Sequence, residues 1–272
     1  MDILEFLSYG FIRRAMTAGS FIAVLCSVLG VLLVLRRLSL MGDGLAHVTF
    51  GSVALGLAMK VYPLYVSIPV VMISSVGILK MIERAGIYGD AAIGIVSSLG
   101  IAVGVVIASA SGGLNVDILS YLFGNILSIG DAEVYISMFL AALVLLTIFF
   151  YFDEIFSMTF DEEFAKASGI NVNRINLILA VLTSVTVVLT MRLVGIMLTS
   201  ALLILPAVTA FQIGRGFKHT LFIAAASGVT SVITGIFVSF CLDLPAGASI
   251  VLINFALFFA AFSLRRFNVF HG

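Results

Sequence analysis

Two side chains that can bind a transition metal stand four residues apart, Asp43 and His47, where an apolar segment begins. If a helix begins at Asp43, the two residues lie about 40° apart around its axis and roughly 6 Å apart along it, so both side chains can reach one point. A carboxylate oxygen and an imidazole nitrogen are ligands for zinc, manganese and iron. Because polar groups are costly in an apolar membrane segment, such groups usually have a function, and metal binding is one candidate. The alternative is an aspartate that caps the helix and a histidine that only packs.

The segments that must position this pair have the composition of a membrane protein. Of the 272 residues, 62% are hydrophobic and 10% charged, and the mean hydropathy is +1.25, which is more apolar than a soluble core requires. The formal net charge of zero argues against a nucleic-acid partner. The sequence contains no G-x-x-x-x-G-K-[ST] phosphate loop, no H-E-x-x-H and no G-x-S-x-G motif. We therefore expect neither ATP hydrolysis by this chain nor another enzymatic activity, and no bound cofactor.

We predict about nine transmembrane helices in a single domain, residues 1–272, of an all-α integral membrane protein. Most of the apolar segments are long enough to cross a bilayer as a helix, and they span 12–35, 44–60, 62–82, 91–109, 132–152, 172–190, 193–213, 220–241 and 246–264. The segment 114–127 is apolar but too short to cross, which suits a half-helix at the outer face. An ordinary amphipathic loop helix is the alternative there.

The basic residues predict that the N-terminus lies outside and the C-terminus in the cytoplasm. With nine spans, ten Lys and Arg side chains then fall on or near the cytoplasmic side, namely Arg36, Arg37, Lys80, Arg84, Lys166, Arg174, Arg215, Lys218, Arg265 and Arg266. Four fall outside, namely Arg13, Arg14, Lys60 and Arg192. This orientation puts Asp43 and His47 toward the cytoplasmic side of the second span. A site within the membrane therefore requires the connection before Asp43 to lie deep in the protein.

The longest polar interruption, residues 153–173, is predicted to be a cytoplasmic loop that contains a short helix. Residues 161–167 have helical composition with acidic side chains first, where they favour the positive end of the helix dipole. Gly169 is a natural helix stop. Composition leaves open whether the loop is simply solvated or is a docking surface for a soluble partner. Elsewhere, Gly100 and Gly104 form a G-x-x-x-G pattern, which predicts close packing of two helices.

Several stretches, in order along nearly the whole chain, resemble the permease subunits of bacterial ABC importers for zinc, manganese or iron. They are GVLLVLRRLSLMGDGLAHVTFGSVALG (30–56), DAAIGIVSSLGIAVGV (90–105), LSYLFGNILSI (119–129), FDEEFAKASGINV (160–172), LVGIMLTSALLILPAVTA (193–210) and DLPAGASIVL (243–252). The resemblance implies a type II ABC importer-like permease in the lipid of the bacterial cell (inner) membrane. It further implies a dimer with a second copy of the chain, an ATP-binding ABC subunit that hydrolyses ATP, and an extracytoplasmic metal-binding protein.

The resemblance also implies roles for individual residues. The family's Asp-x-x-x-His pair falls on Asp43 and His47, which are then ligands on the path of the transported Zn, Mn or Fe ion. The family's coupling-helix region, which fits a cleft of the ATPase, falls on a second group of four residues, Asp161, Glu162, Ala165 and Gly169. The metal is cargo in this interpretation.

Three other functions stay open from the sequence. An ABC permease for an organic metal chelate, such as a siderophore or cobalamin, would show chelate-stimulated ATPase activity without bound metal. A secondary transporter would carry ions in liposomes without ATP or partners. A membrane scaffold would transport nothing. The Asp43 and His47 pair disfavours the chelate permease, because a large organic ligand needs no such metal ligands.

Overall fold

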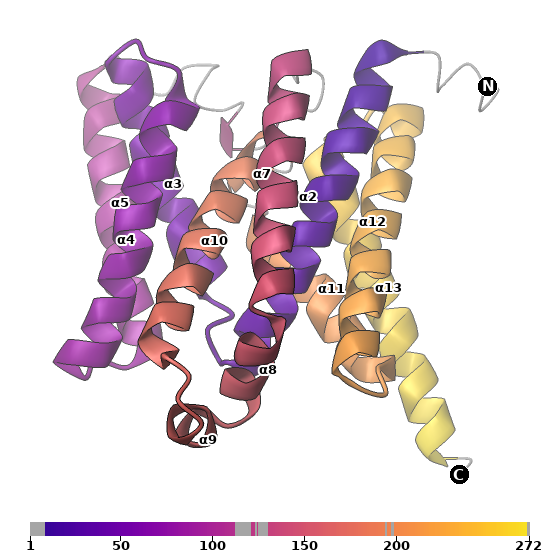
Figure 1. The fold of residues 1–272 in the computed structure, drawn as a ribbon. Coiled ribbons are helices and arrows are strands. Elements are labelled where there is room, and N and C mark those ends of the chain that lie inside the picture. Colours follow the sequence, from indigo (N-terminus) through magenta and orange to yellow (C-terminus); the bar gives the residue numbers. More distant parts are fainter. Residues whose placement is uncertain are drawn as a thin grey trace.

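The computed structural model describes residues 9–111, 121–122, 124, 130–193, 195–196 and 199–270. This part of the chain is built from helices joined by short connections (Figure 1). They are α2 (Gly10–Leu35), α3 (Met41–Ala58), α4 (Pro63–Ala85), α5 (Gly89–Ala110), α7 (Asp131–Phe150), α8 (Phe152–Phe160), α9 (Glu162–Ala167), α10 (Val172–Leu193), α11 (Thr199–Ile213), α12 (Phe217–Leu242) and α13 (Ala246–Phe270). The predicted all-α fold is confirmed. The expected half-helix over 114–127 falls almost entirely outside the described residues.

Each of the nine predicted spans contains a helix, but fewer than nine of these helices are membrane-length. Among the described residues six are long and apolar enough to cross, namely α2, α4, α5, α10, α12 and α13. A seventh span results if α7 and α8 are counted together, although they are bent by 67° where they meet. Two of the remaining helices, α3 and α11, fall short of the membrane-span criteria for local reasons. The first two turns of α3 carry Asp43 and His47, and α11 begins six residues later than predicted and has only 15 residues.

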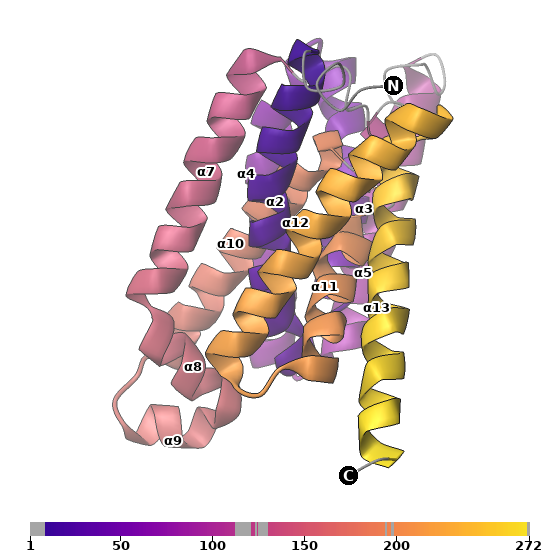
Figure 2. The ribbon, with the colours of Figure 1, turned by 90° about the vertical axis from the view of Figure 1, so that its right-hand side faces the viewer.

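Helices α2 and α10 form the centre of the bundle, and the other long helices surround them (Figures 1 and 2). Helix α2 is apolar on all sides, and its contacts with α7, α10, α11 and α12 bury a row of large side chains, Ile12, Ile22, Leu25, Leu29 and Leu32. The buried hydroxyls of α10 donate to the carbonyl four residues earlier, as at Thr183, Thr186 and Thr190. Such bonds satisfy polar groups where no water is present.

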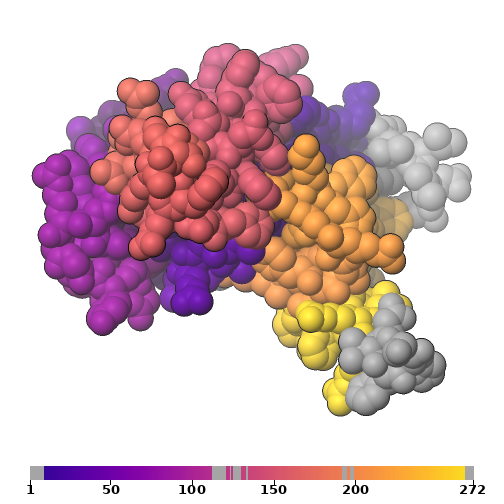
Figure 3. Space-filling model, turned by 60° about the horizontal axis from the view of Figure 1, so that its bottom comes forward, coloured from indigo at the N-terminus to yellow at the C-terminus, as the bar shows by residue number. Residues whose placement is uncertain are grey.

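The two ends of the bundle differ in what they carry. The start of α2 lies at one end, where Arg14 pairs with Asp131 at the start of α7. The α2–α3, α4–α5 and α11–α12 connections, α9 and the last turns of α13 lie at the opposite end (Figure 1). Seen from that end, the segment with α8 and α9 protrudes toward the viewer over the ends of the other helices (Figure 3). This protruding segment also differs from the sequence prediction.

The protruding segment contains two helices, and the prediction of a single short helix within a loop was incomplete. Helix α8 occupies residues predicted to be loop, because Phe152, Phe156 and Phe160 recur every four residues and form one apolar face. All three rings lie against Phe217 at the start of α12, with centroids 5.1 to 5.8 Å apart. The aromatic contacts hold α8 against the bundle and leave α9 beyond it.

Helices α3 and α5 approach each other unusually closely, as the G-x-x-x-G pattern predicted. A Cβ atom on Gly100 would lie 2.7 Å from the Cα atom of Val48, and one on Gly104 would lie 3.0 Å from the Cα atom of Gly51. On α3, a Cβ at Gly51 would lie 2.6 Å from the carbonyl oxygen of Gly100. Missing side chains on both helices therefore allow backbone contact beside His47, and this contact fixes the position of α3.

The variant Gly100→Ala is expected to lower the midpoint of thermal unfolding in detergent, measured by circular dichroism at 222 nm. The added methyl group meets backbone atoms that cannot rotate away, which costs about 1–3 kcal/mol. Gly94→Ala on the same helix is the matched control, because a Cβ there meets nothing within 4 Å. Equal midpoints for the two variants would contradict close packing at Gly100.

Candidate functional site

Asp43 and His47 lie side by side on the first two turns of α3. The Nε2 atom of His47 is 3.5 Å from the Oδ2 atom of Asp43, and the side chains are 32% and 46% exposed, respectively. Every other residue from Met41 to Ala54 is buried. No side chain caps the start of α3, so Asp43 is not the cap of the alternative interpretation, and His47 is half-buried beside it. The two groups form the one accessible polar patch on the buried part of this helix.

The distance between the two atoms suits shared coordination of one ion. In a tetrahedral zinc site with bonds near 2.1 Å, neighbouring ligand atoms are roughly 3.4 Å apart. The 3.5 Å between the carboxylate oxygen and the imidazole nitrogen is close to this value. Within the described residues, no group of three or more His, Cys, Asp and Glu side chains could hold a metal. At this point one chain therefore presents two groups of the ligand type, fewer than the four of a tetrahedral site.

A third polar side chain reaches the pair from α11. The Ser200 hydroxyl donates a hydrogen bond of 3.2 Å to the Oδ1 atom of Asp43, which leaves Oδ2 toward His47. Such a contact orients a carboxylate for coordination. Sequence reasoning missed Ser200, because it is 157 residues from Asp43 and nothing in its own segment points to α3. The only available signal was its place in one of the stretches that carry the resemblance.

The four residues assigned to the coupling region build α9 and hold it in place. Asp161 is the N-cap of α9, and its carboxylate accepts a 2.9 Å hydrogen bond from the Phe164 amide. Glu162 pairs with Lys166 at 2.7 Å, and this hydrogen bond raises the pKa of Lys166. Ala165 is fully buried. Gly169 has a φ of 85°, the left-handed conformation that ends a helix, so the predicted stop is confirmed.

The exposed surface of α9 includes other residues as well. Glu163 is exposed, and the Phe164 side chain is 63% exposed although it is aromatic. The Phe160 ring, at the end of α8, is also mostly exposed. An exposed phenylalanine on a protruding helix outside the bundle is the kind of feature that marks a protein-interaction surface. Glu163 and Phe164 therefore extend the exposed surface that Asp161, Glu162 and Gly169 also form.

The connection between α2 and α3 contacts α9 through Arg36. Arg36, the first residue after α2, has a side chain only 12% exposed, and its guanidinium lies 3.7 Å from the Oε2 atom of Glu162 on α9. Met41, at the start of α3, is buried, whereas Arg37 and Leu40 within the connection are exposed. The connection that precedes Asp43 is thus only partly buried, so the depth expected for a site within the membrane is met in part.

Comparison with known proteins gives consistent matches over almost the entire chain. Residues 8–265 match the model of the ABC 3 transport family. The chain is 32% identical to the manganese transport system membrane protein MntC of Halalkalibacterium halodurans, over 95% of this chain and 88% of that protein. It is 29% identical to the high-affinity zinc uptake system membrane protein ZnuB of Haemophilus influenzae, over 90% and 94%. PsaBC of Streptococcus pneumoniae, solved in complex with a Fab, contains a chain with a TM-score of 0.86 and 31% identity, covering 96% and 95%.

Replacing the N-cap of α9 should loosen this helix without affecting the bundle. Asp161→Ala is expected to raise the hydrogen-exchange rate of the Phe164 amide by roughly fivefold, because a lost N-cap costs about 1 kcal/mol. Asp161→Asn, which can still accept the bond, is the matched control. Equal exchange rates in both variants, measured by mass spectrometry in detergent, would show that the cap does not stabilise α9.

Proposed function

The chain belongs to the ABC 3 transport family, and on this premise we propose that it is the membrane permease subunit of an ATP-driven importer of divalent transition-metal ions. It is a multi-pass membrane protein, and ATP hydrolysis belongs to a separate subunit of the transporter. The observation that supports a metal cargo from within the chain is the Asp43–His47 pair, with its ligand atoms 3.5 Å apart on a buried helix. We regard residues 1–272 as one transmembrane permease domain.

The ligand types of the Asp43–His47 pair agree with the metals named for the relatives. A carboxylate oxygen and an imidazole nitrogen serve manganese, zinc and iron alike. The relatives named above are a manganese transport protein and a zinc uptake protein, so these two metals are the first candidates. A hydrated ion must exchange part of its water shell for protein ligands to pass an apolar bundle, whereas an organic chelate keeps its own ligands. This difference favours a bare metal ion over a siderophore or cobalamin.

The incomplete ligand set supports a homodimer. One chain offers one oxygen and one nitrogen, and a tetrahedral zinc ion needs four ligands. Two copies of the chain, meeting with their Asp43–His47 pairs face to face, supply four. The partial exposure of both side chains on an otherwise buried helix leaves them available for such an arrangement. A site assembled from two chains can also be pulled apart, which lets the ion leave after it has bound.

The protruding segment is the proposed ATPase contact. We assign residues 153–173 to the cytoplasmic coupling-helix loop, in which Asp161, Glu162, Ala165 and Gly169 shape α9 and Glu163 and Phe164 face the ATPase cleft. This end of the bundle is then cytoplasmic, with the C-terminus, and the N-terminus is outside. The extracytoplasmic metal-binding protein delivers its ion at the opposite end, across a bacterial cell (inner) membrane. When ATP closes the two ATPase subunits, the transmembrane helices rock. The Asp43–His47 pair thereby becomes accessible first from one side of the membrane and then from the other.

The variants Asp43→Ala and His47→Ala are expected to reduce ATP-dependent metal uptake by at least about tenfold, because each removes a direct ligand. The measurement is uptake into proteoliposomes that contain the chain, its ATPase and its binding protein, with Zn, Mn and Fe in competition. The competition also identifies the metal. Ser200→Ala should give a smaller loss, since it changes only the orientation of Asp43.

His219→Ala serves as the control for these variants. His219 is exposed at the start of α12, where its Nδ1 atom accepts a hydrogen bond from the Arg215 amide. It should transport normally, and all variants should still assemble with the ATPase. Normal uptake by His47→Ala would contradict the ligand role of the pair.

Changes on the outward face of α9 should weaken ATPase association. Glu163→Lys reverses an exposed charge and Phe164→Ala removes an exposed ring, and neither residue pairs with the bundle among the described contacts. We expect each to reduce recovery of the ATPase in a detergent pull-down by about tenfold, as removal of an interface anchor does. Lys60→Glu, exposed in the α3–α4 connection at the other end, should leave recovery unchanged. Full recovery with both α9 variants would place the docking surface elsewhere.

A further inference from the structure

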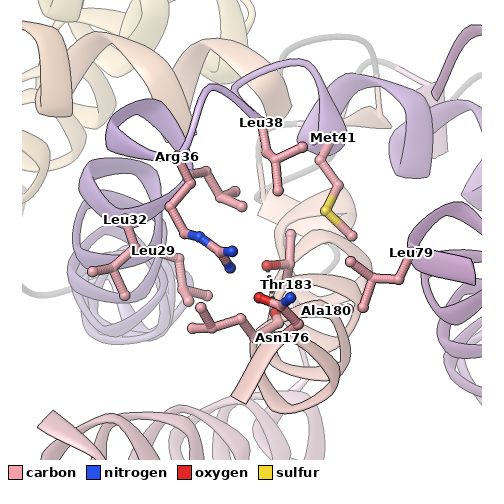
Figure 4. Close-up of a pocket in the computed structure, with 11 residues that line it drawn as sticks. Leu29, Leu32, Arg36, Leu38, Met41, Leu79, Asn176, Ala180 and Thr183 are labelled. Atoms are coloured by element: carbon pink, nitrogen blue, oxygen red, sulfur yellow. Dashed lines mark hydrogen bonds between the residues drawn. The ribbon is translucent and has the colours of Figure 1, made fainter. Parts of the chain in front are cut away.

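Arg36 is a charged side chain that points into the bundle. It follows the last residue of α2, and its guanidinium is directed toward Asn176 of α10, between Leu38, Met41 and Leu79 (Figure 4). The cavity that these residues line has a volume of about 10 Å³, roughly the space of one water molecule. Arg36 is therefore largely buried where α2, α3, α4 and α10 meet, with 12% of its side chain exposed.

The charged partners of Arg36 belong to two other helices. Its guanidinium lies 3.7 Å from Glu162 on α9, and the charge of Glu83 on α4 also stabilises it. Glu83 accepts a 3.0 Å hydrogen bond from the Asn176 amide on α10. Burial lowers the pKa of Arg36, while Glu162 and Glu83 raise it. Among the ion pairs of the described residues, Arg36–Glu162 is the one that joins α9 to another helix.

The position of Glu162 affects the energy of the largely buried charge. A buried guanidinium that loses its carboxylate partner is strongly destabilised, so Arg36 is expected to follow Glu162. Beside the pair lies an open groove of about 740 Å³, lined by Arg36, Lys80, Glu83, Arg84, Glu162 and Lys166. The groove provides room for α9 to shift relative to α4. Glu83, on the groove wall, adds a second negative charge that stabilises Arg36, and its carboxylate accepts a hydrogen bond from the Asn176 amide.

The backbone between Arg36 and the metal pair has little slack. The Leu38 amide bonds to the Leu33 carbonyl at 2.8 Å, and the Met41 amide bonds to the Leu38 carbonyl at 2.9 Å. The Gly44 amide then bonds to the Leu40 carbonyl at 3.0 Å, within the turn that carries Asp43. Consecutive hydrogen bonds thus tie the end of α2 to the first turn of α3. A displacement of Arg36 is passed to Asp43 without a flexible segment between them.

From this geometry we infer that Arg36 is a positioning residue, which transmits movement of α9 to the Asp43–His47 pair through its salt bridge with Glu162. The inference rests on the proposed function, because it takes α9 as the ATPase contact and the pair as the metal site. When ATP closes the ATPase subunits and α9 shifts, Arg36 moves with Glu162 and turns the start of α3. The spacing of the ligands changes as a result, and the ion is bound or released in step with ATP.

The test compares metal ions imported per ATP hydrolysed, in proteoliposomes that contain the chain, its ATPase and its binding protein. Arg36→Gln is expected to lower this ratio about tenfold, within the range of measured couplings between sites. Arg37→Gln is the matched control, since it removes the same charge from the neighbouring, exposed residue and should keep the ratio of the unmodified protein. An unchanged ratio in Arg36→Gln overturns the inference. Loss of the ATPase from the Arg36→Gln complex overturns it as well, because the role of Arg36 would then be docking.

A double-mutant cycle distinguishes transmission from simple stabilisation. Glu162→Gln should lower the number of metal ions imported per ATP hydrolysed, as Arg36→Gln does. In the double variant this ratio should be no lower than in the more impaired of the two single variants, because both substitutions act on one contact. Losses that multiply in the double variant would overturn the inference. Lack of uptake of Zn, Mn and Fe by the unmodified protein would instead contradict the proposed function.

A second measurement tests the link between Arg36 and the Asp43–His47 pair without requiring transport. In a His47→Cys background with Cys241→Ser, maleimide labelling of position 47 in the assembled complex should change when ATP is added. The change should disappear in Arg36→Gln and persist in Arg37→Gln. If labelling changes equally with and without Arg36, the link is overturned whether or not the protein carries metal. This readout therefore separates failure of the link from failure of the proposed function.

Discussion

A charge inside an apolar helix bundle must have a partner, and this requirement explains where the polar groups of the described chain lie. Arg36 is enclosed at the end of α2 because Glu162 and Glu83 face it. Asp43 is held on a buried helix because His47 and Ser200 lie within 3.5 Å of its oxygens. The hydroxyls of α10 bond to their own helix for the same reason. Ser27, Ser227 and Asn254 are exceptions, because buried polar atoms of their side chains have no hydrogen-bond partner among the described residues.

The sequence predicted those features that depend on local pattern. Apolar runs located all nine helices of the bundle, and the acidic start and Gly169 located α9 to within one residue. The G-x-x-x-G pattern identified the close face of α5, since small residues have few other uses at that spacing. Hydrophobicity alone could not give the late start of α11, because the residues before Thr199 are as apolar as those that follow it. Helix α8 was missed because its acidic start made the segment look like a loop, while its three phenylalanines pack only through their contacts with Phe217, which is distant in the sequence.

The contact of Arg36 with Glu162 and that of Asp43 with Ser200 could not be predicted from the sequence. The two members of each pair are more than a hundred residues apart, and no periodicity links either pair. Their meeting depends on how α9 and α11 pack, which is a tertiary property. The sequence did supply the types of residue, an arginine and an aspartate on either side of one short connection. The structure adds that the arginine contacts α9 and the aspartate contacts α11.

The two-ligand pair and the enclosed arginine are physically suited to each other. A complete four-ligand cage within one chain would bind a metal tightly and release it slowly, which a transport path must avoid. In the proposed dimer, two ligands per chain bind weakly until a second pair meets them, so the affinity for the metal depends on the relative position of the helices that carry the pairs. Helix α3 is fixed against α5 by backbone contact at Gly51, Gly100 and Gly104, so its first turn can change direction only with its neighbours. In the proposed coupling, Arg36 is the contact through which a force from α9 acts on that turn, and the affinity of the site thereby follows the state of the ATPase.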